Sequence, residues 1–342
     1  MRRAAAAAAL ACVLGAGAPA GAEVTHRILD FRDLRGWAYD DHDAALEVYL
    51  ETCRDMRSEA WEALCAIADT RPNARAFFET FFRPVLIEDG APMLFTGYYE
   101  PELRGSLRRE GPYRHPVYRV PPDLDVLPWY SRAEIEEDGH LDGKGLEIAW
   151  VDDPVDAFFL QIQGSGRIRL PDGTALRVGY GGKNGHEYRS VGRELVRRGI
   201  YEDHQVSADV IRNWVRRNPQ EGAALLRHNP SYVFFREVNE VPPDRGPLGA
   251  MNRSVTPLRS IAVDPAHVPL GAPVWIEKAG KAPLRRLTVA QDTGSAIKGA
   301  QRADIFYGTG RAAGRAAGQV RDGGRMVALL PIEMAFAFAP GI

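Results

Sequence analysis

The spacing of apolar residues changes along the chain, and each change predicts a different kind of secondary structure. Between residues 43 and 81 apolar side chains recur every three or four positions, as in ALEVYLETCRDMRSEAWEALCAIADT, which predicts helices. The segment APMLFTGYYEPELRGS alternates instead and predicts a strand that ends at Glu100. The last hundred residues predict further strands in SIAVD, APVWIEK, RRLTVAQDTG, DIFYGTG and RMVALLP. These patterns predict a mainly β protein with an N-terminal helical segment.

Glycine and proline divide the rest of the chain into short elements. The 342 residues include 34 Gly and 24 Pro, and about 150 residues per domain predicts two domains. Between residues 104 and 240 we expect short strands and turns, with FFLQIQGSGRIRL forming a hairpin that turns at Gly164–Gly166. One helix, EYRSVGRELVRRG, is expected to end at Gly199, and GRAAGRAAGQV predicts another near the end of the chain.

The first 22 residues have the pattern of a secretory signal peptide. Arg2 and Arg3 precede an apolar run, and the sequence Ala20-Gly21-Ala22 matches a cleavage site. We therefore expect a soluble, exported, periplasmic protein that begins at Glu23. The alternative is a lipoprotein of the outer membrane anchored at Cys12. It is less favoured because Cys12 lies inside the apolar run and Ala9 stands where a lipoprotein signal carries Leu.

The other two cysteines, Cys53 and Cys65, form an even pair in an exported chain, which predicts a disulfide. On one straight helix their Cα atoms would be about 18 Å apart. A disulfide requires less than about 7 Å. The pairing therefore requires a break near residues 56–58 and a helical hairpin. The alternative is a pair of buried free thiols.

Charge and motifs exclude several functions. The formal net charge is −2 and the basic residues form no stripe, so we expect no nucleic acid partner. GYGGKNGH has Asn184 where a phosphate loop requires Ser or Thr, and Ser165 in QGSGR lacks the glycines of a hydrolase elbow. The eight histidines form no pair at ligand spacing. We therefore expect no nucleotide, no metal and no cofactor.

Three aspartates lie at the ends of predicted strands in the C-terminal part. Asp292 ends LTVAQD, Asp304 begins DIFYG, and Asp264 follows SIAV. They could converge on one rim of a barrel, although aspartate before Thr-Gly or Pro is also common in turns. Asp304 has apolar and aromatic neighbours, and burial of this kind keeps a carboxyl protonated near neutral pH. Thr96, Tyr98 and Tyr99 are side chains suited to a sugar.

Five segments follow one another along the chain: FTGYYEP, FFLQIQGSGRIRL, NPSYVFF, GPLGAMNRSVTPLRSIAVDPAHVPLGAPVWI and QDTGSAIKGAQRADIFYGTG. Together, and in this order, they resemble the membrane-bound lytic transglycosylase A family. The resemblance spans about residues 85–330, and its C-terminal part is similar to the three-aspartate (3D) domain, over about residues 245–332. It implies a double-psi β-barrel built from residues 23–103 and 241–342. A smaller β-domain, residues 104–240, would be inserted and form the other wall of a glycan groove.

The same resemblance implies roles for individual residues. Asp304 matches the single catalytic acid, Asp292 the acid that supports it, and Asp264 the third and weakest candidate. The residues that match groove-lining or substrate-binding positions are Thr96, Gly97, Tyr98, Gln163, Gly164, Ser165 and Lys298. The expected partner is the glycan strand of peptidoglycan, bound by a monomer that associates peripherally with the outer membrane or a cell-wall complex.

The implied reaction is cleavage of the β-1,4 bond between N-acetylmuramic acid and N-acetylglucosamine. Asp304 would act as acid and then as base, and the 6-hydroxyl of the sugar would close a 1,6-anhydro ring. Two alternatives stay open. One is a hydrolase that uses two carboxylates, with Asp292 or Asp264 activating water. The other is a cell-wall-binding protein without catalysis.

Overall fold

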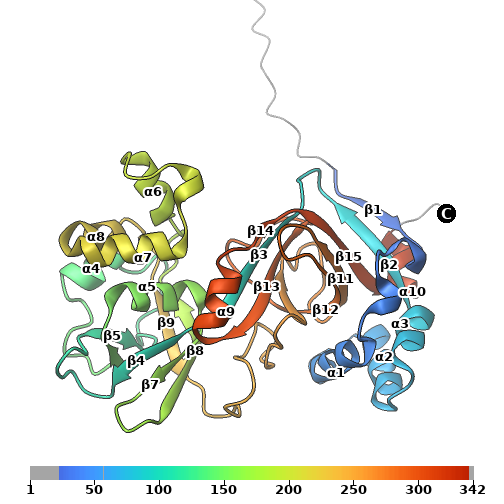
Figure 1. Ribbon diagram of the computed structural model, residues 1–342. Helices are drawn as coiled ribbons and strands as arrows, with labels where there is room; N and C mark the ends of the chain where they lie inside the picture. The colour runs from blue at the N-terminus through green and yellow to red at the C-terminus, as the bar shows by residue number, and fades with distance from the viewer. Residues whose placement is uncertain (1–22, 57, 339–342) are drawn as a thin grey trace, which may run out of the picture.

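The computed structural model describes residues 23–56 and 58–338 and divides them between two lobes (Figure 1). The predicted signal peptide and Cys12 lie outside the described residues. The main lobe holds a nine-stranded sheet, in which the strands follow the order β1-β2-β15-β11-β12-β10-β13-β3-β14. Its strands are β1 (Thr25–Ile28), β2 (Phe82–Glu88), β3 (Leu94–Glu100), β10 (Ser260–Val263), β11 (Pro273–Lys278), β12 (Leu284–Asp292), β13 (Arg302–Thr309), β14 (Arg321–Asp322) and β15 (Gly324–Pro331).

The strands of the main lobe confirm the predicted mainly β character of the chain. Every strand expected in the last hundred residues is present, and β3 ends at Glu100 as predicted. Their apolar side chains, with Trp275 fully buried among them, form the largest core. Two pairs of strands, β10 with β12 and β13 with β3, run parallel, while the other pairs are antiparallel. The double-psi connection of these strands stays a prediction.

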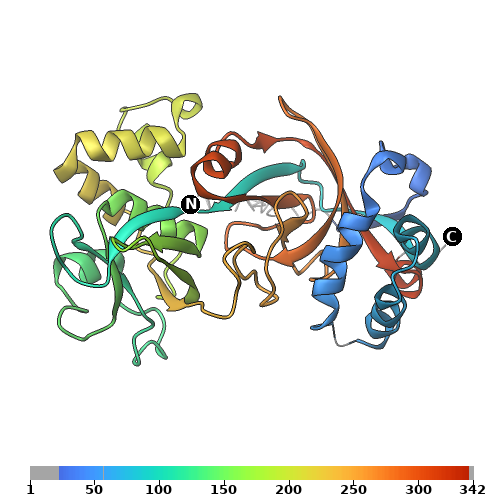
Figure 2. The ribbon, with the colours of Figure 1, turned by 60° about the horizontal axis from the view of Figure 1, so that its bottom comes forward.

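The N-terminal helices cover the end of the main lobe that faces away from the other lobe (Figure 2). They are α1 (His42–Cys53), α2 (Glu59–Asp69) and α3 (Ala74–Phe81). Asp41 and Asn73 cap α1 and α3 by accepting hydrogen bonds from first-turn N–H groups. Aromatic side chains fill the space between the helices and β2; Tyr49, for example, packs against Phe77 and Phe82. This cluster attaches the helices to the sheet.

A disulfide joins Cys53, the last residue of α1, to Cys65 in α2. The helices form the hairpin that this pairing requires, and the two Cα atoms are 5.4 Å apart. Replacing both cysteines by serine should lower the free energy of unfolding by about 2–4 kcal/mol, because the reduced unfolded chain has more conformational freedom. Urea unfolding of the variant and the wild type measures this difference. Dithiothreitol should lower the urea midpoint of the wild type but not that of the variant. Equal urea midpoints of the wild type and the variant without reductant would contradict the prediction.

The second lobe, here called the insert lobe, spans residues 102–237. Its six strands follow the order β5-β6-β4-β7-β8-β9. They are β4 (Glu102–Ser106), β5 (His115–Tyr118), β6 (Glu147–Val151), β7 (Gly166–Arg169), β8 (Ala175–Lys183) and β9 (Val233–Glu237). Five helices accompany them: α4 (Arg132–Glu137), α5 (Pro154–Gln163), α6 (Val191–Arg197), α7 (Ala208–Arg217) and α8 (Pro219–Arg227). The predicted helix before Gly199 corresponds to α6, but the other four helices were not expected.

The predicted hairpin at FFLQIQGSGRIRL is wrong, because its first half is helix α5. Asp153 caps this helix by accepting from the N–H groups of Val155 and Asp156, and Pro154 is suited to its first turn. Gly164 ends the helix with φ of 75°, a left-handed conformation that favours glycine. A short apolar run can occur in a buried helix or in a strand, and here the flanking caps decide between them. The Gly164–Gly166 turn therefore joins a helix to β7.

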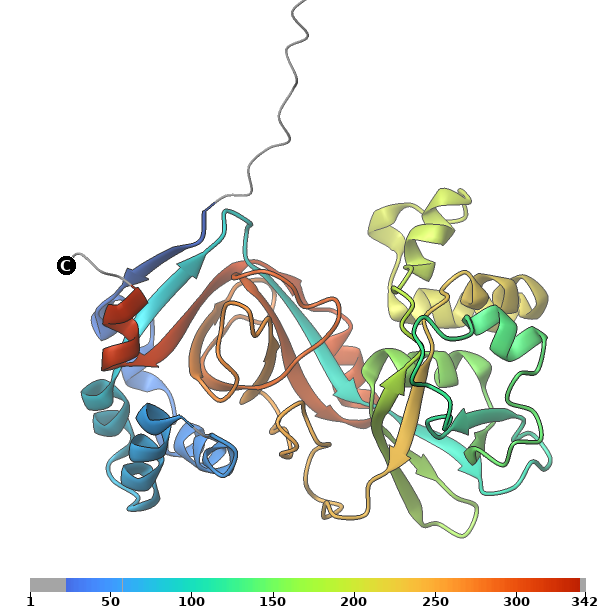
Figure 3. The ribbon, with the colours of Figure 1, turned by 180° about the vertical axis from the view of Figure 1, so that it is seen from behind.

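Strand β3 and the following strand β4 connect the two lobes, as the view from behind shows (Figure 3). The helix α9 (Gly310–Ala317) covers β3 and β13, and α10 (Ile332–Phe338) lies against β2 and β15. The predicted helix at GRAAGRAAGQV is thus confirmed. A Cβ atom on Gly97 would lie 2.8 Å from the Cα of Ala317, so this glycine permits the close approach of α9. None of the described helices has the length and apolar character needed to cross a membrane.

Candidate active site

Asp304 lies on β13 beside Thr96 of the neighbouring strand β3. The two residues are register partners in a parallel pair, so their side chains share one face of the sheet. The Thr96 hydroxyl donates a hydrogen bond of 2.7 Å to Asp304 Oδ1. Asp304 Oδ2 receives no hydrogen bond from any described residue, and the side chain is partly exposed. This oxygen is therefore the one that can meet a ligand.

Burial raises the pKa of Asp304 above its ordinary value, because crowding by protein atoms disfavours the charged form. The hydrogen bond from Thr96 and the positive charge of Arg302 act in the opposite direction but do not cancel this effect. A raised pKa favours a protonated Asp304, the form that can act as a general acid.

Asp292, the last residue of β12, is the second acid at this place. A bulge in the pairing of β10 with β12 puts Ile261 opposite Ala290 but Ala262 opposite Asp292. Without this extra residue Gln291 would occupy the position, and its side chain is instead buried against Ser260 and Thr52. Bulges commonly turn a side chain toward an active site in this way.

Both carboxylate oxygens of Asp292 already accept hydrogen bonds. Oδ1 accepts from the backbone N–H groups of Ala250 and Thr293, each at 2.9 Å, and Oδ2 accepts from the Tyr98 hydroxyl at 2.9 Å. Burial raises the pKa of Asp292 to about 6, against the effect of these donors, and the charge of Asp304 adds to the rise. The same carboxylate and burial hold the Tyr98 hydroxyl protonated by raising its pKa.

The two acids flank the short strand β10 on opposite sides. Ala262 is the register partner of Asp292 on β12 and of Asp304 on β13. Adjacent strands are about 4.8 Å apart, which puts the two aspartate backbones at roughly twice that separation. The structure thus brings together Asp304, Asp292, Thr96 and Tyr98.

The structure gives Asp264 a different set of partners. Its side chain is 8% exposed and accepts hydrogen bonds from the backbone N–H groups of Gly299, at 2.9 Å, and Ala266, at 3.2 Å. Lys298 lies beside it, with Nζ 3.6 Å from Oδ1. Burial alone would raise the pKa of Asp264, but the two N–H groups and the cation outweigh it and lower the pKa. Asp264 thereby ties two loops together, and Lys298 is its counter-ion.

The three residues expected in the insert lobe lie where α5 meets β3. Gln163 Oε1 accepts a hydrogen bond of 3.1 Å from the backbone N–H of Tyr99. Gly164 ends α5, and Ser165 is buried before β7. The Tyr99 hydroxyl in turn accepts a hydrogen bond of 3.0 Å from Arg212 of α7. Gln163 therefore connects the insert lobe to the strand that carries Thr96 and Tyr98.

Sequence reasoning missed Arg302, which contacts this strand, and Glu100, which ends it. Arg302 donates a hydrogen bond of 2.9 Å to Thr96 Oγ1. Glu100 is fully buried between Arg167 and Arg177. Alternation along a strand could have indicated both, because Arg302 is two residues from Asp304 and Glu100 is two residues from Tyr98, on the same face.

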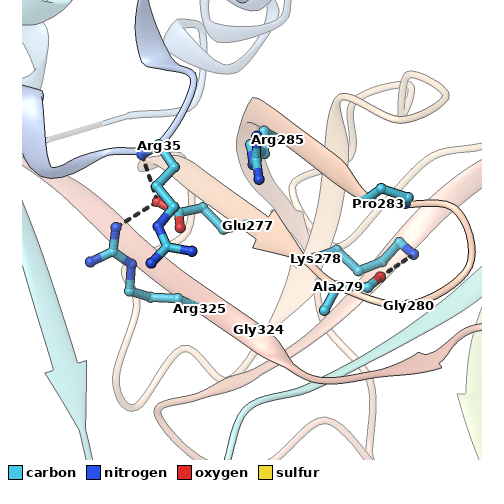
Figure 4. Close-up of a pocket in the computed structure, with 9 residues that line it drawn as sticks. All are labelled: Arg35, Glu277, Lys278, Ala279, Gly280, Pro283, Arg285, Gly324 and Arg325. Atoms are coloured by element: carbon cyan, nitrogen blue, oxygen red, sulfur yellow. Dashed lines mark hydrogen bonds and ion pairs between the residues drawn. The ribbon is translucent and has the colours of Figure 1, made fainter.

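A separate cavity of about 580 Å³ lies in the main lobe, and none of the three aspartates lines it. The side chains of Arg35 and Arg325 approach Glu277 there, while Arg285 lines another wall (Figure 4). Glu277 accepts hydrogen bonds from the Arg35 backbone and from Arg325. Within the described part of the chain, no cluster of three or more His, Cys, Asp or Glu side chains is arranged to hold a metal ion.

Comparison with known proteins identifies relatives over most of the chain. A family model described as the MltA specific insert domain matches residues 94–236, and one described as the 3D domain matches residues 259–330. The chain is 37% identical, over 279 residues, to the membrane-bound lytic murein transglycosylase A of Escherichia coli K12, covering 78% of this chain and 73% of that protein.

Solved structures resemble the whole described fold. The crystal structure of MltA from Neisseria gonorrhoeae superimposes with a TM-score of 0.80 at 34% identity, covering 91% of this chain and 94% of that one. The structure of E. coli MltA with bound chitohexaose gives a TM-score of 0.74 at 29% identity and covers 85% of this chain and 90% of that one.

Proposed function

Because the chain belongs to the membrane-bound lytic murein transglycosylase A family, we propose that it is a lytic transglycosylase that cleaves peptidoglycan in the cell envelope. The relatives carry this activity in their names, and one of them binds chitohexaose, an oligosaccharide. The substrate would be the glycan strand, lying in a groove between the wall formed by residues 23–103 and 241–342 and the wall formed by residues 104–240.

The proposed reaction uses Asp304 alone for proton transfer. Protonated Asp304 donates its proton to the oxygen of the glycosidic bond as the bond from C1 of N-acetylmuramic acid breaks. The resulting carboxylate then accepts the proton of the 6-hydroxyl, whose oxygen attacks C1 and closes the 1,6-anhydro ring. Asp304 ends the cycle protonated, and no water is consumed. The attack is intramolecular, so it gains from effective molarity.

The state of Asp292 is the observation that favours this mechanism over hydrolysis. A hydrolase requires a second carboxylate that accepts a proton from water or attacks the sugar itself. Both oxygens of Asp292 are engaged by Ala250, Thr293 and Tyr98. Asp264 is held by Gly299 and Ala266 in the same manner. These contacts support positioning roles for both, whereas Asp304 keeps one oxygen available.

Digestion of purified peptidoglycan in oxygen-18-labelled water tests this proposal. The wild-type products should be muropeptides one water lighter than hydrolysis products and without the heavy isotope, because no water enters the bond. Mass spectrometry of the digest measures both properties. A hydrolase would give reducing ends that carry the label, and a protein that only binds the cell wall would release no products.

A further inference from the structure

We propose that Arg302 is a positioning residue for the reaction, and that it acts through the Thr96 hydroxyl to leave Asp304 Oδ2 as the oxygen that carries the transferable proton. The inference rests on the proposed role of Asp304. It concerns three side chains on one face of β3 and β13, joined in the order Arg302, Thr96, Asp304.

The direction of the two hydrogen bonds follows from the chemistry of the groups. Arg302 Nη2 lies 2.9 Å from Thr96 Oγ1, and a guanidinium group can only donate. The threonine hydroxyl has a single hydrogen, and its oxygen is already accepting from Arg302. That hydrogen is therefore directed to Asp304 Oδ1, at 2.7 Å. When Asp304 is protonated, Oδ1 is occupied as an acceptor and the proton resides on Oδ2.

The backbone holds the Arg302 side chain in place for this purpose. Its Nη1 donates to the carbonyl oxygens of Ala303, at 2.7 Å, and Leu94, at 3.3 Å. The guanidinium thus bridges β13 and β3 two register positions before the pair Asp304 and Thr96, on the same face. Planar guanidinium donors in this arrangement fix the geometry more tightly than a single ammonium group would.

Thr96 also separates the positive charge from the acid. A direct ion pair between an arginine and a carboxylate strongly favours the ionised form, which cannot donate a proton. Acting through a hydroxyl group, Arg302 stabilises the carboxylate formed after proton donation without preventing reprotonation. Burial still keeps the pKa of Asp304 above its ordinary value. This balance suits a group that serves first as acid and then as base.

The other groups near Asp304 come from the strands and the helix that surround it. The carboxyl group of Asp292 of β12 lies close enough for its charge to interact with that of Asp304, and the Tyr98 hydroxyl of β3, which stays protonated, lies near both. Strand β10 contributes Ala262, which is uncharged. Strand β14 contributes Arg321, the register partner of Thr96, whose side chain is exposed. The arginines of α9, Arg311 and Arg315, are exposed. Arg302 is therefore the cation connected to Asp304 by hydrogen bonds.

Carbon-13 NMR titration of the Asp304 carboxyl group, assigned with Asp304→Asn, tests the inference directly. We expect a higher pKa of Asp304 in Arg302→Met and in Thr96→Val than in the wild type, because Thr96→Val removes the donor at Oδ1 and Arg302→Met removes the group that directs this donor to Oδ1. The control Arg285→Met removes an exposed arginine of β12 that lines the separate cavity, and the pKa of Asp304 should not change. Arg302→Gln, which is uncharged, should raise the pKa too and serves if the methionine variant does not fold.

A double-mutant cycle distinguishes action through Thr96 from a field effect of the charge. In the Thr96→Val background, Arg302→Met should change the pKa of Asp304 little further. The inference would be overturned if Arg302→Met changed the pKa of Asp304 as much in the Thr96→Val background as in the wild-type background. An unchanged pKa of Asp304 in Arg302→Met alone would overturn it too.

Turnover on peptidoglycan gives a second readout for Arg302→Met. It should fall by about tenfold, which corresponds to one charge-assisted hydrogen bond, while KM stays near the wild-type value. The alkaline limb of the pH profile of turnover should move to higher pH. A profile identical to that of the wild type would contradict the inference. The NMR titration requires no substrate, so it tests the role of Arg302 independently of activity. Full activity of Asp304→Asn would instead contradict the proposed function.

Discussion

Replacing Asp304 by asparagine is expected to lower turnover by about 10²–10⁴-fold, the contribution typical of general acid–base catalysis. Asparagine keeps the shape of the side chain, and its carbonyl can still accept the hydrogen bond from Thr96. It cannot donate and recover a proton at Oδ2. The rate of muropeptide release from purified peptidoglycan measures the effect. Binding of chitohexaose, followed by calorimetry, should be nearly unchanged.

Asp292→Asn is the matched control for this experiment. Its side chain occupies the mirror position across β10 and has a similar size and degree of exposure. Because its hydrogen bonds hold Tyr98 and two backbone N–H groups, its loss should reduce turnover less than the loss of Asp304 does. Near-normal activity of Asp304→Asn would remove it from the mechanism. A larger effect of Asp292→Asn would assign the proton transfer to the second acid.

Replacing Glu100 by alanine is expected to destabilise the fold by about 3–5 kcal/mol, the cost of breaking a buried ion pair from one side. Glu100 is fully buried and pairs with Arg167 of β7 and Arg177 of β8, each at 2.9 Å. Thr309 donates to the same carboxylate at 2.7 Å. The variant leaves two arginines unpaired where β3 passes from the main lobe into the insert lobe.

Urea unfolding followed by tryptophan fluorescence measures this effect, and the chain offers a neighbouring control. Glu102, two residues further on, pairs with Arg169 at 2.8 Å, but the side chains of Arg169 and Glu102 are 57% and 29% exposed. Exposed ion pairs contribute about 0–1 kcal/mol, so Glu102→Ala should unfold nearly as the wild type does. Equal midpoints for the two variants would show that the buried cluster contributes no more than a surface pair.

The elements that the sequence predicts best are those with a strong local pattern. β11 and β12 contain long apolar runs with β-branched residues, and α1 and α2 contain helical spacing with a charged break between them. The weakest predictions fall in the insert lobe. There the sequence predicts a strand where α5 lies, because Phe158, Phe159 and Leu160 form a short run that suits either structure. The cap at Asp153 and Pro154 was the local signal that could have corrected it.

In the candidate site, too, the sequence predicts local features but not the contacts between distant residues. Composition and turn signals place Asp264, Asp292 and Asp304 at strand ends, and these features are local. Which of them meet depends on strand order and register, which join residues far apart in the sequence. Thr96 and Asp304 are separated by 208 positions and Tyr98 and Asp292 by 194, yet each pair shares a hydrogen bond. No local pattern contains this information.

By itself, the sequence determined the mainly β character of the chain, the helical hairpin that holds Cys53 and Cys65, and the short list of acids. Each follows from side-chain periodicity or from the reach of a covalent bond. The tertiary structure alone decided that a bulge at β12 turns Asp292 rather than Gln291 toward Asp304, and that Asp264 ties two loops. It also decided that the hydrogen bonds from Arg302 to Asp304 run through Thr96. The physical reason is that strand pairing sets which side chains share a face, and pairing is a property of the folded sheet.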